Sequence, residues 1–160
     1  FIIYVHQNKL EVKKSFYWLV LAVIFVFLSV DESVQVHEEV ARILRPSVGE
    51  SMNGFLYWAW VVPYSIFVIA AGVFFLRFVL SLPAAIRNLF FIGGAMYISG
   101  ALLLEFPEGY FYKVYGLDYI YNRILYCIEE LFEMGGVVIF IYALLNYMKD
   151  NKITVSFSAE

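Results

Sequence analysis

Residues 121–147 read YNRILYCIEELFEMGGVVIFIYALLNY, an apolar run that nevertheless carries the glutamates Glu129, Glu130 and Glu133. A helix needs about 20 largely apolar residues to span the hydrocarbon of a bilayer, and this run is longer than that. Carboxylates inside a spanning helix are costly, so they indicate a functional site by default, with partners to be found elsewhere in the chain.

The composition of the whole chain is that of a membrane protein. Of its 160 residues 62% are hydrophobic and 20% are aromatic, more than the core of a soluble domain of this size can hide. The sequence therefore predicts an all-α membrane protein, a polytopic helical bundle in a single domain over residues 1–160 with at least four transmembrane helices. The expected spans are residues 15–31, 54–76, 88–105 and 120–148. Residues 1–7 read like the tail of a further apolar segment, so we also expect an upstream span that is missing or truncated.

The basic residues orient these spans. Seven of them fall on one side of the predicted map: Lys9, Lys13, Lys14, Arg77, Arg87, Lys149 and Lys152. The positive-inside rule makes that side cytoplasmic. Eleven of the fourteen acidic residues then lie on the opposite side or in its half of the bundle. We therefore expect the inner membrane of a bacterium, with an acidic site facing the periplasm.

A short amphipathic helix is predicted on the periplasmic surface over Ser33–Arg45. Its apolar residues recur at helical spacing, and His37 belongs to that face, directed towards the bundle. Asp31 is the expected N-cap. The helix is expected to end in a loop that contains Pro46, Gly49 and Asn53.

Two further features are expected in the spans. Pro63 predicts a bend in the second span, and the small residues Gly93, Gly94 and Gly100 predict close helix packing in the third. The third span is expected to end at Pro107. The tyrosine-rich segment Gly109–Tyr121 is expected to be an outer loop that forms an interfacial aromatic lid.

Four separate segments bring carboxylates and one imidazole to the outer half of the bundle. The candidate metal ligands are Asp31, Glu32, His37, Glu105, Glu129, Glu130 and Glu133. The acids that we expect to be solvated loop charges are Glu38, Glu39, Glu50, Glu108 and Asp118. No residue is assigned a catalytic role, and whether the protein is an enzyme is left open.

Carboxylates that share a pocket of low dielectric need a counter-charge. A divalent metal is one candidate: Zn²⁺, Mn²⁺ or Fe²⁺ if His37 binds it, or Ca²⁺ if His37 does not. A salt-bridge network with Arg42, Arg45 or Arg123 is the second, and protonation of some acids is the third. The single cysteine, Cys127, excludes an internal disulfide and a cysteine-based zinc site.

Two motifs resemble those of a group of uncharacterised bacterial integral membrane proteins. The first is Leu28-Ser-Val-Asp31-Glu32, followed after four residues by His37-Glu38; the second is Glu129-Glu130-Leu-Phe-Glu133-Met-Gly-Gly136. The group pairs an L-S-x-D-E-x4-H-E stretch with a later E-E-x-x-E-M-x-G helix. The resemblance implies an upstream span and a bacterial inner-membrane location. It implies no activity.

The favoured function is that of an accessory or assembly subunit of a membrane complex, with a cation-binding site that faces the periplasm. A metal-dependent membrane hydrolase and a proton-coupled transporter are the alternatives. The expected partners are the lipid bilayer and other membrane proteins or further copies of this chain. No nucleic-acid signature is present.

Overall fold

The computed structural model describes residues 1–10, 14–48, 54–116 and 118–154, and in these residues every regular element is a helix. The elements are α1 (Ile2–Lys9), α2 (Ser15–Val34), α3 (Val36–Val48), α4 (Val61–Leu80), α5 (Ala84–Ile98), the π-helical segment η2 (Ser99–Leu104), α6 (Glu105–Tyr115) and α7 (Ile120–Asp150). The predicted all-α class is confirmed.

Three helices in the described part of the chain are long and apolar enough to cross a membrane: Ser15–Val34, Val61–Leu80 and Ala84–Tyr115. They correspond to the first three predicted spans, so the chain has the helices of a multi-pass membrane protein. The third comprises α5, η2 and α6 in one run of 32 residues, which at 1.5 Å per residue extends about 48 Å and exceeds the ~30 Å hydrocarbon thickness. The fourth predicted span forms α7, of 31 residues.

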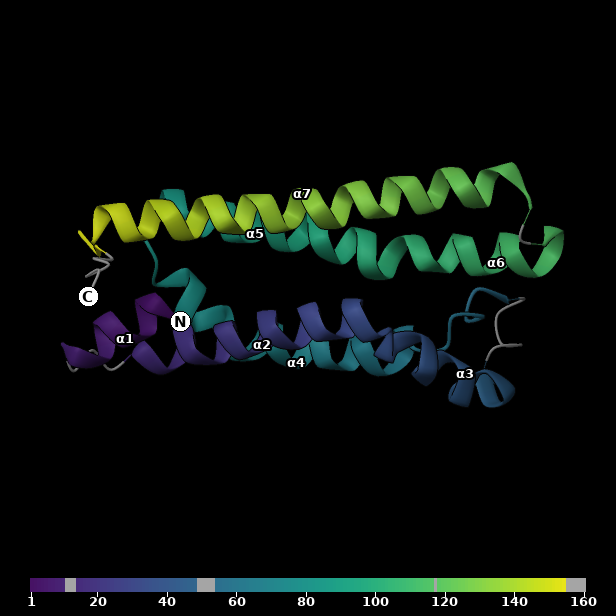
Figure 1. Cartoon of the computed structure of the whole chain (residues 1–160), viewed down its shortest axis with the longest axis horizontal. Helices are drawn as coiled ribbons and strands as arrows, with labels where there is room; N and C mark the ends of the chain where they lie inside the picture. The colour runs from purple at the N-terminus through teal and green to yellow at the C-terminus, as the bar shows by residue number, and fades with distance from the viewer. Residues whose placement is uncertain (11–13, 49–53, 117, 155–160) are drawn as a thin grey trace, which may run out of the picture.

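The helices lie in two layers along one long axis (Figure 1). The α7 helix runs beside the continuous α5–η2–α6 helix. In the other layer α2 lies beside α4, where the ring of Tyr17 stacks on that of Phe78 at 4.9 Å. The N-terminus, α1 and the last turns of α7 lie at one end, whereas α3 and α6 lie at the other. Lys9, Arg77 and Lys149 occupy the last turns of α1, α4 and α7, so we call the end that holds α1 the basic end and the opposite one the acidic end.

Small residues allow α5 and η2 to approach α7 closely, as predicted. A methyl group added at Gly136 would lie 2.8 Å from the Gly93 carbonyl oxygen. One added at Gly100 would lie 2.8 Å from the Glu129 carbonyl oxygen and 2.9 Å from Cγ of Glu133. Distances under 3.0 Å leave no room for a Cβ. The glycines thus place the acidic half of α7 directly against η2.

Two separate apolar cores hold the layers together. The basic-end core is built around Trp18, whose ring centroid lies 5.0 Å from that of Phe78 and 4.6 Å from that of Tyr147. The acidic-end core contains Ala41, Trp60, Val61 and Leu102. Aromatic contacts such as that of Phe25 with Phe140 connect α2 to α7 between the two cores.

The expectations about Pro63 and Pro46 are wrong. Pro63 does not bend a span, because α4 begins at Val61 and a proline in the first turn of a helix removes no hydrogen bond. Pro46 does not end the surface helix, which continues to Val48. Gly49 and Asn53, the other expected loop residues, lie outside the described residues.

The boundaries of the surface helix also differ from the prediction. Ser33 still belongs to α2, which continues to Val34, and Gln35 then takes a left-handed conformation (φ 57°, ψ 44°) that separates α2 from α3. A left-handed residue is a common way to end a helix. Asp31 is therefore not the N-cap residue of α3 but lies in the last turn of α2.

The predicted outer loop Gly109–Tyr121 is mostly helical. The chain continues through Pro107 as α6 and stops at Gly116, whose φ is +80°. Pro107 is accommodated because it falls in the first turn of α6, directly after the π-helical η2 has already shifted the hydrogen-bond ladder. The aromatic clustering is nevertheless present: the rings of Tyr115 and Tyr119 stack at 4.4 Å.

Candidate functional site

A cavity of about 490 Å³ lies between the two layers, in the interval between the two cores. Its lining comes from α2, α3, α4, the α5–η2–α6 helix and α7. The ionisable lining side chains, tyrosines aside, are eight carboxylates and one histidine, with neither lysine nor arginine among them: Asp31, Glu32, His37, Glu38, Glu105, Glu108, Glu129, Glu130 and Glu133. All seven residues predicted for the site line this one cavity.

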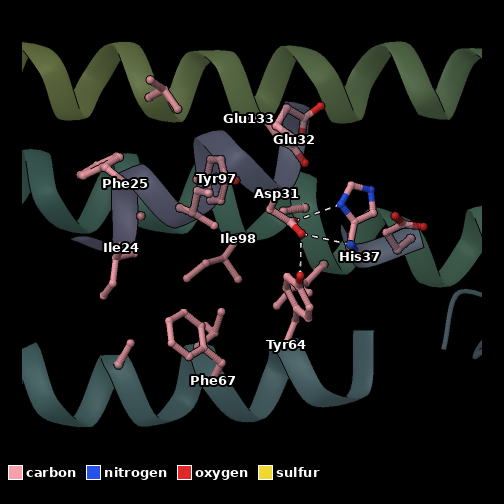
Figure 2. Close-up of a pocket in the computed structure, with 18 of the residues that line it drawn as sticks. Ile24, Phe25, Asp31, Glu32, His37, Tyr64, Phe67, Tyr97, Ile98 and Glu133 are labelled. Atoms are coloured by element: carbon pink, nitrogen blue, oxygen red, sulfur yellow. Dashed lines mark hydrogen bonds and ion pairs between the residues drawn. The ribbon is translucent and has the colours of Figure 1, made fainter. Parts of the chain in front are cut away.

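Asp31 connects three helices (Figure 2). Its side chain on α2 is 9% exposed. Oδ1 accepts hydrogen bonds from the backbone N–H of His37 at 3.0 Å and from the Tyr64 hydroxyl at 2.7 Å, while Oδ2 lies 3.0 Å from His37 Nδ1. The bond to the His37 N–H satisfies one of the free donors at the start of α3. The expected capping role of Asp31 is therefore present, although the residue acts from the preceding helix.

Trp60 links this group to the next carboxylate. The His37 ring lies 5.2 Å from the Trp60 ring, which in turn stands edge-on to Tyr64 at 4.8 Å. The Trp60 indole donates a hydrogen bond to Glu105. Through this tryptophan the acidic-end core joins the Asp31–His37 pair to α6.

Three carboxylates form a compact group, which we call the glutamate cluster: Glu105 and Glu108 on α6 and Glu129 on α7. One oxygen from each lies within 4.8 Å of the other two, an arrangement that can hold a metal ion. Glu105 is only 8% exposed. Oε2 of Glu129 is closed to solvent and has no hydrogen-bond partner among the described residues.

The remaining predicted acids lie near the glutamate cluster but outside it. Glu133 of α7 and Glu32 of α2 lie together on the side of the cavity that α7 forms (Figure 2). Glu130 interacts with the Tyr126 hydroxyl. Within one cavity, the predicted single site is thus divided into the Asp31–His37 pair, the glutamate cluster and the remaining acids around them. His37 is bound to Asp31 rather than to the glutamates.

None of the three outer arginines lines the cavity, although the Arg45 guanidinium lies 5.4 Å from the ring of Trp58, which does. Arg42 binds Glu39 at 2.6 Å on the exposed face of α3, where that carboxylate raises the pKa of the guanidinium. Arg45 lies 4.3 Å above the Tyr57 ring, a cation–π contact. Arg123 pairs with the exposed Asp118 at 3.4 Å. In the described residues the arginines therefore do not supply the counter-charge that the cavity acids need.

Sequence reasoning missed two important residues. Glu108 was expected to be a solvated loop charge, yet it belongs to the glutamate cluster. Glu108 follows Glu105 by three residues, a spacing that places both on one face of a helix. This signal was not used, because the helix was expected to end at Pro107. Tyr64 has no such signal, because its role depends on how α4 lies beside α2. Of the other acids expected in solvent, Glu39 and Asp118 are exposed. Glu38 is exposed as well, although it also lines the cavity, and Glu50 lies outside the described residues.

Fold and site together define a multi-pass, all-helical membrane protein with an acidic cavity between its helices. Over residues 2–147 the chain matches the model of the family described as domain of unknown function DUF8692, and it belongs to that family. Searches among curated proteins and among solved structures find no match.

Proposed function

We propose that this protein binds a cation at the carboxylates of its cavity, on the periplasmic side of a bacterial inner membrane. The observation that carries the proposal is the charge of the lining, which has eight carboxylates and neither lysine nor arginine. At separations of 4.8 Å or less in the glutamate cluster, each pair of ionised carboxylates repels by about 3 kcal/mol if the effective dielectric constant is about 20. A bound positive charge turns this repulsion into attraction.

The donor atoms favour a hard cation. The glutamate cluster offers carboxylate oxygens, and the one cavity imidazole is held by Asp31 in the neighbouring group. Oxygen ligands suit Ca²⁺ and Mn²⁺ better than Zn²⁺, which prefers nitrogen and sulfur. We therefore place Ca²⁺ first among the divalent metals, with Glu105, Glu108 and Glu129 as its ligands.

A proton is the second candidate cation. Glu108 and Glu129 are placed for a hydrogen bond to each other, and two carboxyl groups can share such a bond only when one of them carries a proton. This contact supports proton-linked transport as the alternative function.

The proposed topology has at least four spans, with α7 as the fourth. Beyond Glu133 this helix is almost entirely apolar, and it lies along α5 towards the basic end. Large side chains such as Val138 and Leu145 are exposed on it, which suits lipid or a neighbouring membrane protein. These surfaces support a role as an accessory or assembly subunit of a larger complex.

Binding of radiolabelled Ca²⁺ to the purified protein in phosphatidylcholine nanodiscs tests the proposal. We expect saturable binding that a chelator reverses and that Glu129→Gln weakens. Asp118→Asn is the matched control, because that carboxylate is 98% exposed and lies outside the cavity. Equal binding by both variants, or none by the unmodified protein at neutral pH, would exclude Ca²⁺ at this site. If Ca²⁺ does not bind, the proton alternative is tested next. The protein is transferred in detergent into unbuffered solution, and the protons that it takes up are measured.

A further inference from the structure

The acids occupy only one end of the cavity. On α7 the carboxylates at positions 129–133 are followed towards the basic end by Val137 and Phe140, and on α2 the acids at 31 and 32 are preceded by Leu21–Leu28. On α4 the lining continues from Tyr64 to Val79 with no charged side chain. The cavity therefore has an acidic part near the acidic end and a longer apolar part directed towards the basic-end core (Figure 2).

The apolar part is far larger than a bare ion requires. From Val68 to Val79 the uncharged lining of α4 advances eleven residues, which is about 16 Å along the helix. That length matches an extended hydrocarbon chain of about 12 carbons, at roughly 1.25 Å of advance for each ~1.5 Å carbon–carbon bond. The volume of about 490 Å³ falls within the roughly 300–1,000 Å³ of small-molecule sites. Water needs polar partners in such a space, and the apolar part offers almost none.

We propose that the cavity binds a single-chain amphiphile with a positively charged amine head, taken from the surrounding bilayer. This inference rests on the proposed cation site and specifies the cation as an ammonium group. The head lies among the carboxylates, and the chain extends between α2, α4 and α7. The charge of the lining selects the head, because an anionic or phosphate-bearing head would face eight carboxylates without a basic residue to balance it.

Aromatic side chains at the acidic part favour an ammonium group as well. Trp60 lines the cavity next to His37 and Glu105. Trp58 lines it as well, but its ring centroid already lies 5.4 Å from the Arg45 guanidinium carbon. Indole faces attract ammonium groups, most strongly where water is excluded, and Trp60 is only 6% exposed. A carboxylate beside an indole offers an ammonium head both an ion pair and a cation–π contact, whereas a neutral alcohol head would gain neither.

Gly72 allows the apolar part to be blocked without touching the acids. It lines the cavity on α4, and a Cβ added there would meet nothing within 4 Å. Gly72→Phe should therefore project a ring into the space that the chain occupies, and it also removes a helix-weakening glycine. Val73→Phe is the matched control, because Val73 is adjacent, 71% exposed and outside the lining.

The experiment uses dodecylamine with a diazirine at the far end of its chain, added to the protein in phosphatidylcholine nanodiscs. After illumination, mass spectrometry locates the labelled residues. We expect labelling at apolar lining residues such as Phe75 and Val79, far stronger than with the dodecanol analogue at the same concentration. Gly72→Phe should reduce this labelling about tenfold or more, the effect of losing a well-fitted chain, and Val73→Phe should leave it unchanged.

The outcomes separate this inference from the proposed cation site. Labelling spread equally over lipid-facing residues, with amine and alcohol alike and no effect of Gly72→Phe, overturns the amphiphile. If that result is obtained but Ca²⁺ or butylamine still binds, and this binding still requires Glu129, the cation site stands without the amphiphile. If the amine labels the lining but Glu129→Gln has no effect on labelling, the chain site exists and the carboxylates do not select the head, which also contradicts the proposal.

Discussion

Asp31 binds both the backbone N–H and the Nδ1 atom of His37, each at 3.0 Å, across the left-handed turn at Gln35. The same carboxylate accepts a hydrogen bond from the Tyr64 hydroxyl. One buried side chain therefore fixes the angle between α2 and the surface helix α3 and also ties α2 to α4.

We expect Asp31→Asn to be more destabilising than Tyr64→Phe. The asparagine keeps the size of Asp31, and its Oδ1 can still accept from the His37 N–H and the Tyr64 hydroxyl, but that oxygen no longer carries a charge, and an NH₂ group replaces the oxygen that faces His37 Nδ1. Hydrogen bonds to charged groups contribute about 1.5–3 kcal/mol and neutral ones about 0.5–1.5 kcal/mol. Thermal unfolding in mild detergent measures the difference, with the exposed Glu39→Gln as control. Equal, small shifts in Tm for Asp31→Asn and Glu39→Gln would show that Asp31 does not hold the junction.

Gly100→Ala should weaken the contact between η2 and α7 by about 1–3 kcal/mol, the usual cost of overpacking. Its Cβ would lie 2.8 Å from the Glu129 backbone and would displace that residue. Gly94→Ala is the matched control, because its Cβ would meet only Phe140 at an ordinary 3.7 Å. We expect Gly100→Ala to lose Ca²⁺ binding together with stability, whereas Gly94→Ala keeps both. A fully stable Gly100→Ala protein with unchanged binding contradicts the observed packing.

The effect of Glu129→Gln on stability should change sign with the cation. With chelator present, the substitution removes one of three mutually repelling carboxylates, so Tm should rise by the equivalent of about 1–3 kcal/mol. With saturating Ca²⁺ it removes a ligand, so Tm should fall relative to the unmodified protein. Parallel melting series with and without chelator measure both differences. Asp118→Asn should show no such reversal, and a Glu129→Gln curve that never crosses that of the unmodified protein argues against a cation at the cluster.

The orientation of the bundle is tested by single cysteines in a Cys127→Ser background. Asp118→Cys, between α6 and α7, should react with a membrane-impermeant thiol reagent added to intact cells. Lys149→Cys, in the last turn of α7, should react only after the membrane is opened, because the basic side faces the cytoplasm. The reverse pattern would place the acidic end in the cytoplasm.

The class of the fold could be predicted from composition alone, because 62% hydrophobic residues in 160 can be hidden only by lipid. The shared location of the acids could be predicted as well, since alternating spans bring the ends of α2, α6 and α7 to one side. The partners of the individual residues could not. The bond between His37 and Asp31 depends on a single left-handed residue, Gln35, which no sequence pattern indicates.

The end of the third span was predicted wrongly for a related reason. Proline normally stops a helix because it lacks an N–H, and that rule placed Glu108 in a loop. Local hydrogen bonding in η2 overrides the rule, and hydrogen-bond register is not visible in the order of the residues. The three arginines show the same limit: Arg45 is close in sequence to the acids, yet its guanidinium lies over Tyr57.

The π-helical turn at Ser99–Leu104 has a geometric consequence for everything beyond it. A turn of this kind holds one residue more than an α-helical turn, and one residue corresponds to a rotation of about 100° around the helix axis. Glu105 and Glu108 therefore point towards α7 only because the backbone before them is wound more loosely. Removing a single leucine from η2 would keep every carboxylate in the chain yet rotate these two by about a quarter turn, away from Glu129. The chemistry of the cavity is set as much by the winding of one turn of backbone as by the identity of its side chains.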